Sequence, residues 1–482
     1  MYDLRPVGYV IGLLLLVLGS TMLVPLVTDV YFTNGHWPAF AQSAVLTALP
    51  GALLALSCAN GVKPRLTIQQ TFLLTSTVWL VLPLFGALPF MIGATSARAV
   101  DAVFEAMSGM TTTGATVFTG LQDLPQGLLL WRGMMQWFGG VGIIVVAMVF
   151  LPELRVGGMQ IFRSEAFDTM GKILPRASEI AKQISVIYVA LTLACALSYI
   201  ALGMGQFEAI VHAMTTLSTG GFSTSDASFG AYQGPMEYVA ALFMILASLP
   251  FVRYVQILAG SARPFVLDTQ VRAYLGTILA LTVFFAVYRL LVNGDHFEHG
   301  IREALFNVTS IISGTGYASV DYQLWGGVAV VLFFFIGLIG GCAGSTACSI
   351  KIFRYQLLLA SIATQLRRLY APHGVFEPRY EGRKVSEEVL SSVMAFFMLF
   401  FVSLGVVSIL LGLTGLDFIT SVSGAATALA NIGPGLGDEI GPAGTFTHLG
   451  DTAKWILSVA MLVGRLELMA VFVLFTTRFW RG

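Results

Sequence analysis

Charged residues are scarce in this chain, and this scarcity excludes a protein built from several water-soluble domains in succession. Only 11% of the 482 residues are Asp, Glu, Lys or Arg, whereas 56% are hydrophobic. The mean hydropathy of +0.81 is typical of a polytopic membrane protein. The first apolar run, from about residue 7 to 27, lacks a small-residue cleavage site. We therefore expect a retained helix rather than a removed signal peptide.

Cysteine is also rare, and the residues that most enzyme classes need are missing. The four cysteines lack metal-ligand spacing, and their number gives no disulfide framework. There are no paired carboxylates in a soluble segment, no nucleophile beside a base and no phosphate-binding loop. His212 is interpreted as a packed, hydrogen-bonded histidine. The sequence predicts no enzyme activity, no organic cofactor and no nucleic-acid partner.

What the chain does have is a succession of apolar runs with an uneven charge distribution between them. The runs lie near residues 7–30, 40–60, 68–94, 126–151, 180–203, 236–260, 273–293, 325–350, 388–413 and 453–479. With both termini in the cytoplasm, most of the 26 basic residues fall on the cytoplasmic side, which fixes the orientation. Acidic residues gather on the outer side, where they either raise the local cation concentration or only keep loops soluble.

Four short motifs rich in Ser, Thr and Gly recur about a hundred residues apart. They are Thr111–Ala115, Leu217–Phe222, Ser313–Tyr317 and Asn431–Gly435, and their aligned glycines are Gly114, Gly220, Gly316 and Gly433. Each follows an apolar stretch too short to cross a bilayer, at about 101–112, 206–217, 300–312 and 417–430. Non-helical backbone at membrane depth must be buried in protein or line a wet cavity. We therefore expect four re-entrant loops that face one another.

The residue types of these loops suit a ring of backbone carbonyls that replaces the hydration shell of a cation. Glycine allows neighbouring carbonyls to point the same way, and the half helices aim their negative ends at the loops. The motifs contain no Asp or Glu, which argues against a carboxylate ring for divalent ions. A single such motif would be read as an ordinary helix C-cap, whereas four in register favour a pore.

These patterns predict an all-α polytopic membrane protein with repeated units around a central pore. Residues 1–66 form an N-terminal transmembrane hairpin. Each following unit holds a spanning helix, a pore half helix, a filter loop and a second spanning helix. The expected units are residues 67–155, 156–262, 263–355 and 356–482.

The four motifs, the N-terminal hairpin and the glycine-rich stretch of the third unit resemble the Trk/Ktr/HKT superfamily of potassium transporters, above all its TrkH branch. The resemblance implies that K⁺ is the transported ion, bound by the four aligned glycines and their flanking carbonyls. The fourth loop, with Ile432 and Pro434, diverges most. The flanking residues so implied are Thr112, Thr113, Ser218, Thr219, Gly314, Thr315, Asn431 and Ile432.

Two further features acquire roles from this resemblance. The run from Gly337 to Thr346 is a broken helix that matches an intramembrane gating loop, or else a kinked packing helix. Arg465 stands within the last apolar run, where a charge costs about 2.5–3.5 kcal/mol on insertion scales. It faces the pore below the filter, or forms an ion pair with Glu467 or an acid on another helix, or does both. The predicted gate residues are Gly337, Gly340, Gly341, Gly344, Ser345, Thr346 and Arg465.

The resemblance also implies partners and a location. We expect a homodimer in the bacterial inner membrane, with both termini cytoplasmic, assembled with a cytosolic nucleotide-binding regulatory subunit. The basic segments 153–182 and 351–388 suit docking of that subunit or contact with anionic membrane lipid. The main alternative is a secondary cation symporter, coupled to H⁺ or Na⁺ and working by alternating access. Four similarly oriented loops favour the channel-like pore, and sodium permeation remains open.

Overall fold

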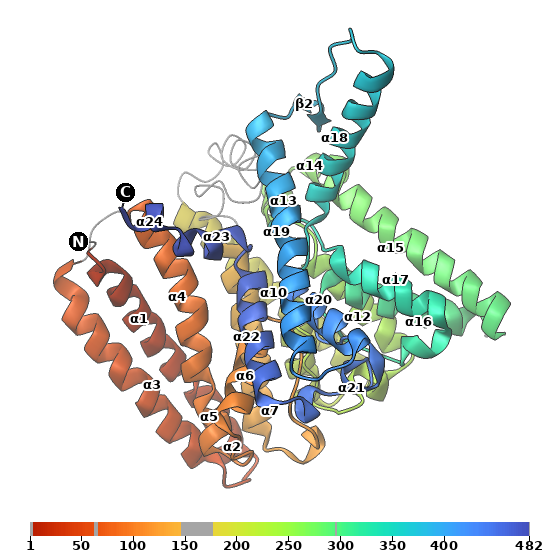
Figure 1. Cartoon of the computed structure of the whole chain (residues 1–482). Coiled ribbons are helices and arrows are strands. Elements are labelled where there is room, and N and C mark those ends of the chain that lie inside the picture. The colour runs from red at the N-terminus through yellow and green to blue at the C-terminus, as the bar shows by residue number, and fades with distance from the viewer. Residues whose placement is uncertain (1–2, 62–65, 146–176, 295, 482) are drawn as a thin grey trace.

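The computed structural model describes residues 3–61, 66–145, 177–294 and 296–481, and in this part the chain is mainly helical (Figure 1). Six of its helices are long and apolar enough to cross a membrane, and two bent helix pairs raise the number to eight. The predicted all-α membrane protein is thereby confirmed. Of the ten predicted runs, 126–151 lies partly outside the described residues and 325–350 is broken.

The N-terminal hairpin consists of α1 (Arg5–Thr21), which α2 (Leu23–Tyr31) continues, and α3 (Trp37–Cys58). Glycines bring the two arms close together. A Cβ atom built on Gly12 would lie 2.7 Å from Gly51 O, so neither position has room for a side chain. Small residues of this kind allow membrane helices to pack at short range.

Four helices of 12 to 17 residues, α6, α11, α16 and α20, alternate along the chain with the helices of the predicted apolar runs. They match the predicted half helices within a few residues, and α16 extends three residues further toward the N-terminus. The bounds are α4 (Ile68–Gly86), α5 (Leu88–Ile92), α6 (Ala99–Met110), α7 (Gln126–Val145), α10 (Ala177–Ala201), α11 (Gln206–Leu217), α12 (Pro235–Ala247), α13 (Phe251–Leu258), α14 (Arg263–Leu267), α15 (Thr269–Tyr288), α16 (Phe297–Ser313), α17 (Gly327–Leu338), α18 (Ile352–Tyr370), α19 (Glu387–Gly412), α20 (Phe418–Ala430), α21 (Gly437–Ile440), α22 (Asp451–Arg465), α23 (Met469–Phe472) and α24 (Thr477–Arg481).

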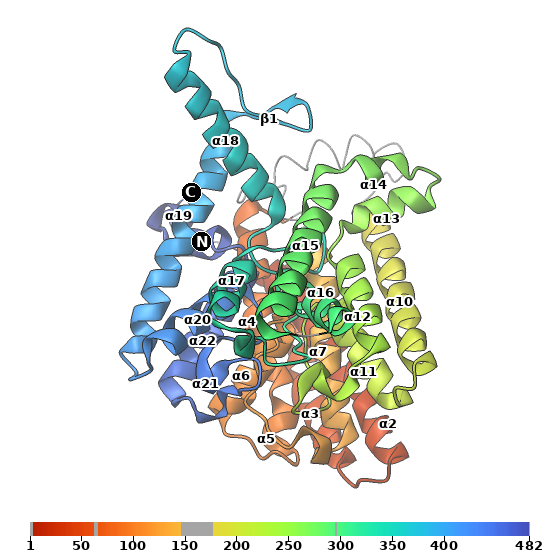
Figure 2. The same cartoon turned by 90° about the vertical axis from the view of Figure 1, so that its right-hand side faces the viewer.

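The division into a hairpin and four units stays a prediction, and part of it cannot be placed. The boundary between residues 155 and 156 lies outside the described residues, as does most of the basic segment 153–182. The basic segment 351–388 begins just before α18 and ends in α19. It includes the hairpin of β1 (Arg379–Tyr380) and β2 (Arg383–Lys384), which lies beside the part of α18 that projects from the other helices in Figure 2. Both termini lie toward this side of the molecule (Figure 1).

Two of the predicted straight runs are sharply bent. The run 236–260 turns by 88° between α12 and α13, because Pro250 lacks an N–H and restricts the residue before it. The run 453–479 turns by 102° after α22. There Glu467 and Leu468 have φ of 60° and 20°. Arg465 is therefore the last residue of a helix and not the middle of a continuous span.

Candidate functional site

The four short helices end in the same backbone conformation. Within two residues of the end of each helix, one residue has a left-handed φ, which residues other than glycine adopt uncommonly. These residues are Thr112 at 54°, Thr219 at 52°, Gly314 at 80° and Asn431 at 53°. Thr112 and Thr219 lie two residues beyond the last helical residue, and Gly314 and Asn431 lie one residue beyond it. Because each of them has a left-handed φ, they align the four loops independently of the sequence.

This alignment changes the second loop by one residue. Two positions beyond the left-handed residue stands a glycine in every loop, and in the second loop it is Gly221 rather than the predicted Gly220. Gly221 has φ of 76°, close to Gly114 at 87° and Gly316 at 79°, whereas Gly220 has no positive φ. Gly433 also has no positive φ, and its place two residues after Asn431 aligns it with the other three. The sequence motif contains two adjacent glycines, so spacing alone could not choose between them. We call Gly114, Gly221, Gly316 and Gly433 the ring glycines.

The ring glycines close a circle of backbone contacts. At each one, the place that a Cβ atom would take lies against the backbone of the next loop. Taken in order, the contacts are from Gly114 to Gly220 O, from Gly221 to Thr315 O, from Gly316 to Gly433 N at 2.7 Å and from Gly433 to Gly114 O at 3.1 Å. A side chain at the first three positions would overlap this neighbouring backbone, so the ring requires glycine.

A cavity opens onto this ring from one side. All four ring glycines line it, together with side chains that include Arg132, Phe222, Asp226 and Phe446. The Asp226 carboxylate accepts hydrogen bonds from the backbone N–H groups of Gly120 (2.8 Å) and Leu121 (3.1 Å). Asp226 therefore joins its own loop to the segment at Gly120 and Leu121 beside the cavity, and it is not simply a solvated loop residue.

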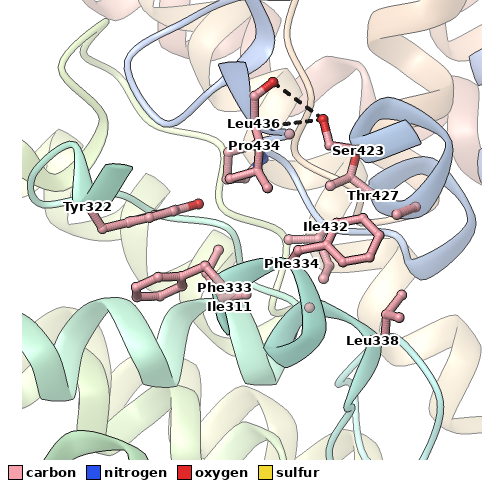
Figure 3. A pocket seen from close by; sticks show the side chains of 13 residues that line it. Ile311, Tyr322, Phe333, Phe334, Leu338, Ser423, Thr427, Ile432, Pro434 and Leu436 are labelled. Atoms are coloured by element: carbon pink, nitrogen blue, oxygen red, sulfur yellow. Dashed lines mark hydrogen bonds between the residues drawn. The ribbon is translucent and has the colours of Figure 1, made fainter. Parts of the chain in front are cut away.

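The predicted flanking residues are buried beside the ring and link the loops. Thr113 Oγ1 accepts from Asn431 Nδ2 at 3.0 Å, which joins the first loop to the fourth. Thr315 Oγ1 lies 2.7 Å from Ser313 Oγ within the third loop. Ser218 is the C-cap of α11, one residue further from the ring than predicted, as the shift in the second loop requires. Ile432 lines a small apolar cavity beside Pro434 (Figure 3).

Sequence reasoning missed Gln136, which clamps the second loop from α7. Its Nε2 donates to Gly220 O at 2.7 Å, and its Oε1 accepts from Phe222 N at 3.0 Å. The side chain is fully buried. Because both contacts join residues more than eighty positions apart, no local sequence signal pointed to it.

On the other side of the ring lies the interrupted stretch between α17 and α18. It runs from Ile339 to Lys351, so it begins two residues later and ends five residues later than the predicted run. Gly337 belongs to the last turn of α17. The other predicted residues, Gly340, Gly341, Gly344, Ser345 and Thr346, are buried within the loop. We call residues 339–351 the intramembrane loop.

The intramembrane loop is fastened to the ends of neighbouring helices. Cys348 N donates to Ser313 O (3.3 Å) and Ser349 N to Ala430 O (2.9 Å), which are the last residues of α16 and α20. On the opposite flank, Cys342 N donates to Ser248 O at 3.0 Å, at the break after α12. The glycines allow close packing, because a Cβ on Gly340 would clash with Cys348 O.

Arg465 contacts this loop directly. Its Nη1 donates to Cys348 Sγ at 2.9 Å, and its Nη2 to Gly139 O at 3.2 Å. The residue is 4% exposed, and its Nε has no hydrogen-bond partner. Cys348 Sγ in turn lies 3.4 Å from Thr112 Oγ1 in the first loop. A contact path thus runs from the ring through the intramembrane loop to a buried guanidinium.

The alternative in which Arg465 pairs with Glu467 is wrong. Glu467 pairs instead with Arg354, at the start of α18. Within the described part of the chain, no carboxylate lies within salt-bridge distance of Arg465. The reversal of the backbone at Glu467 turns its side chain away from the residue two positions earlier. Arg465 therefore leaves an uncompensated positive charge beside the intramembrane loop.

Comparison with known proteins decides the family. The family model described as TrkH, cation transport protein, matches residues 36–481. The chain belongs to the TrkH family. It is 42% identical to the Trk system potassium uptake protein TrkI of Halomonas elongata, over 99% of this chain and 97% of that protein. It is 36% identical to the Trk system potassium uptake protein TrkH of Escherichia coli K12, over 99% of each chain.

The fold of this TrkH family member also matches a solved structure along its whole length. The crystal structure of the potassium transporter TrkH from Vibrio parahaemolyticus aligns with a TM-score of 0.91 and 32% identity, covering 100% of both chains. The family comprises cation transport proteins, so the expectation that the chain is not an enzyme is confirmed by its relatives.

Proposed function

We propose that this chain takes up potassium across the bacterial inner membrane through a channel-like pore whose filter is formed at the ring glycines. The observation that carries the proposal is the closed circle of four loops, in which backbone fills each place where a side chain would stand. Backbone carbonyls gathered in such a ring replace the hydration shell of a monovalent cation. The membrane potential then supplies about 2.3 kcal/mol per 100 mV for each ion that enters.

The named relatives support the choice of ion and extend the proposal to partners. Because they are potassium uptake proteins of the Trk system, we infer that K⁺ is bound in the filter and that a cytosolic nucleotide-binding regulatory subunit assembles on this chain. Its docking surface would be segment 351–388, where α18 and the β hairpin project on the side of both termini (Figure 2). That side would face the cytoplasm, and the chain would function as a homodimer surrounded by lipid.

We further propose that the intramembrane loop is the gate and that the structure represents its closed state. The loop hydrogen-bonds to the helix ends behind the ring, at Ser313 O and Ala430 O. Arg465 adds a positive charge that repels a cation leaving the filter. Opening requires these contacts to break, and a regulatory subunit acting through α18 could pull directly on the end of the loop.

Flux measurements in proteoliposomes test the pore against the alternative of secondary symport. A pore conducts K⁺ and Rb⁺ down the electrochemical gradient, with no movement of H⁺ or Na⁺ linked to it. A symporter must move its coupled ion in fixed proportion. K⁺ accumulation driven by an imposed pH gradient at zero membrane potential would contradict the proposal.

Gly316→Ser should lower the ratio of potassium to sodium permeability. Gly316 has φ of 79°, and its missing Cβ would lie 2.7 Å from Gly433 N. A residue strained in this way costs about 1–3 kcal/mol, so a change of about tenfold is expected. The ratio is measured by reversal potential. Gly327→Ser is the matched control, because Gly327 has open space around it; an unchanged ratio in Gly316→Ser would refute the filter role.

Arg465→Gln should raise basal potassium flux about fivefold, the factor that corresponds to 1 kcal/mol of removed barrier. Glutamine removes the charge and keeps much of the side-chain length and a donor for Cys348 or Gly139. Arg465→Lys keeps the charge and is the matched control. If both variants conduct alike, the guanidinium acts through packing and the electrostatic barrier is wrong.

A further inference from the structure

A row of buried polar side chains lies behind the ring, one on each pore half helix. Counting back nine residues from each ring glycine reaches Glu105, His212, Asn307 and Gly424. The fourth position has no side chain, and the adjacent Ser423 takes its place. We call Glu105, His212, Asn307 and Ser423 the buttress residues. The exposed fraction of none of them exceeds 2%.

Each buttress residue binds the chain two or three residues after its ring glycine. Glu105 Oε2 accepts from Val117 N at 2.9 Å and, like Oε1, from the Thr116 hydroxyl. Asn307 uses both the oxygen and the nitrogen of its side-chain amide. Its Oδ1 accepts from Ser319 N at 3.2 Å, and its Nδ2 donates to Ser319 Oγ at 3.0 Å.

The second and fourth loops repeat the arrangement with different chemistry. His212 Nδ1 lies 2.8 Å from Glu208 O, which can only accept, so this nitrogen carries the proton. His212 Nε2 lies 3.0 Å from Ser223 Oγ. In the fourth loop, Ser423 Oγ accepts from Leu436 N at 2.9 Å and lies 3.3 Å from Leu436 O, as the dashed lines in Figure 3 show.

The first buttress also reaches into the second loop. Arg132 pairs with Glu105 at 2.8 Å, donates to Ser223 O at 2.9 Å and lies 4.2 Å above the centre of the Phe222 ring. Both charges are fully buried. The hydrogen bonds that hold two successive loops are thus part of one network.

We propose that the buttress residues are specificity-determining positioning residues, which hold the ring glycines at the width that favours K⁺. The inference rests on the proposed filter. Among the described residues, no ladder of backbone hydrogen bonds fixes the spacing of the loops. Each buttress ties its loop to its own half helix, nine residues before the ring glycine, or ten in the fourth loop. Discrimination between ions through carbonyl oxygens depends on the size and stiffness of the ring, so a looser tether lowers it.

Ser423→Ala gives the cleanest test. The change is small and leaves Leu436 N without its buried acceptor. Ser421→Ala is the matched control. Ser421 lies on the same helix and is 4% exposed, and its hydroxyl donates to Leu416 O rather than to a filter loop. We expect Ser423→Ala to lower the potassium-to-sodium permeability ratio about threefold to tenfold, as the loss of one net hydrogen bond allows. Ser421→Ala should leave the ratio unchanged.

Asn307→Leu supplies a second variant in another loop, with Asn307→Gln as the conservative comparison. The permeability ratio does not depend on how much protein folds, so it separates positioning from simple loss of stability. Glu105 is a poor choice, because its removal would strand the Arg132 charge. Wild-type ratios in both Ser423→Ala and Asn307→Leu would overturn the inference, as would an equal fall in Ser421→Ala. If Gly316→Ser also keeps the wild-type ratio, the filter itself is refuted.

Discussion

Gly221→Ala is expected to reduce potassium flux to below about 1% of the wild-type rate, whereas Gly220→Ala should retain a measurable part of it. The reason lies in the backbone. Gly221 has φ of 76°, and a Cβ there would clash with Thr315 O, a backbone atom that cannot move without the third loop. Strain of about 1–3 kcal/mol together with that overlap accounts for a hundredfold loss.

The two glycines can be separated by using Gln136. The three atoms nearest to a Cβ on Gly220 all belong to the Gln136 side chain, which is able to move away at the cost of its clamp. Gly220→Ala in a Gln136→Ala background should therefore conduct like Gln136→Ala alone, while Gly221→Ala should remain inactive in that background. The measurement is ⁸⁶Rb⁺ uptake into proteoliposomes, normalised to folded protein. If Gly221→Ala takes up more ⁸⁶Rb⁺ than Gly220→Ala, then Gly220 and not Gly221 is the ring glycine.

A disulfide between the first loop and the intramembrane loop should close the pore reversibly. Cys348 Sγ lies 3.4 Å from Thr112 Oγ1, so Thr112→Cys places two sulfur atoms near bonding distance. Oxidation is expected to remove about 90% or more of the flux, and a reductant should restore the rate measured before oxidation. A gate that must leave the pore cannot do so while it is bonded to the filter loop.

The double variant Thr112→Cys with Cys348→Ala is the control, because it keeps the new thiol and lacks its partner. Removing residues 340–345 is the complementary change, and it should raise basal flux by shortening the obstruction. If mass spectrometry shows that the oxidised Thr112→Cys variant contains the disulfide and the variant still conducts, the pore opens without movement of the intramembrane loop at Cys348. If the variant that lacks residues 340–345 folds and its basal flux does not rise, the proposal that this loop is the gate is also contradicted.

Much of the fold could be predicted because its signals are local. The bounds of α11, Gln206–Leu217, coincide with the predicted half helix, since a short apolar stretch before a glycine motif defines both ends. The bends near Pro250 and Glu467 were missed, because hydropathy records that a segment is apolar and not the direction in which it runs. His212 was predicted to be a packed, hydrogen-bonded histidine, and its hydrogen bonds confirm this. The register that it shares with the other buttress residues was missed, because the four align only after Gly221 replaces Gly220.

Three properties of this chain follow from its sequence alone. It lies in a membrane, its short helices fall at known places along the chain, and glycine and hydroxyl residues end those helices. Those properties depend on neighbours along the chain. The tertiary structure alone decided which glycine of the second motif enters the ring and that Arg465 meets Cys348 rather than Glu467. These contacts join residues about a hundred positions apart. The glycine is chosen by which backbones fit together without side chains, and the partner of Arg465 by the bend of the chain after α22.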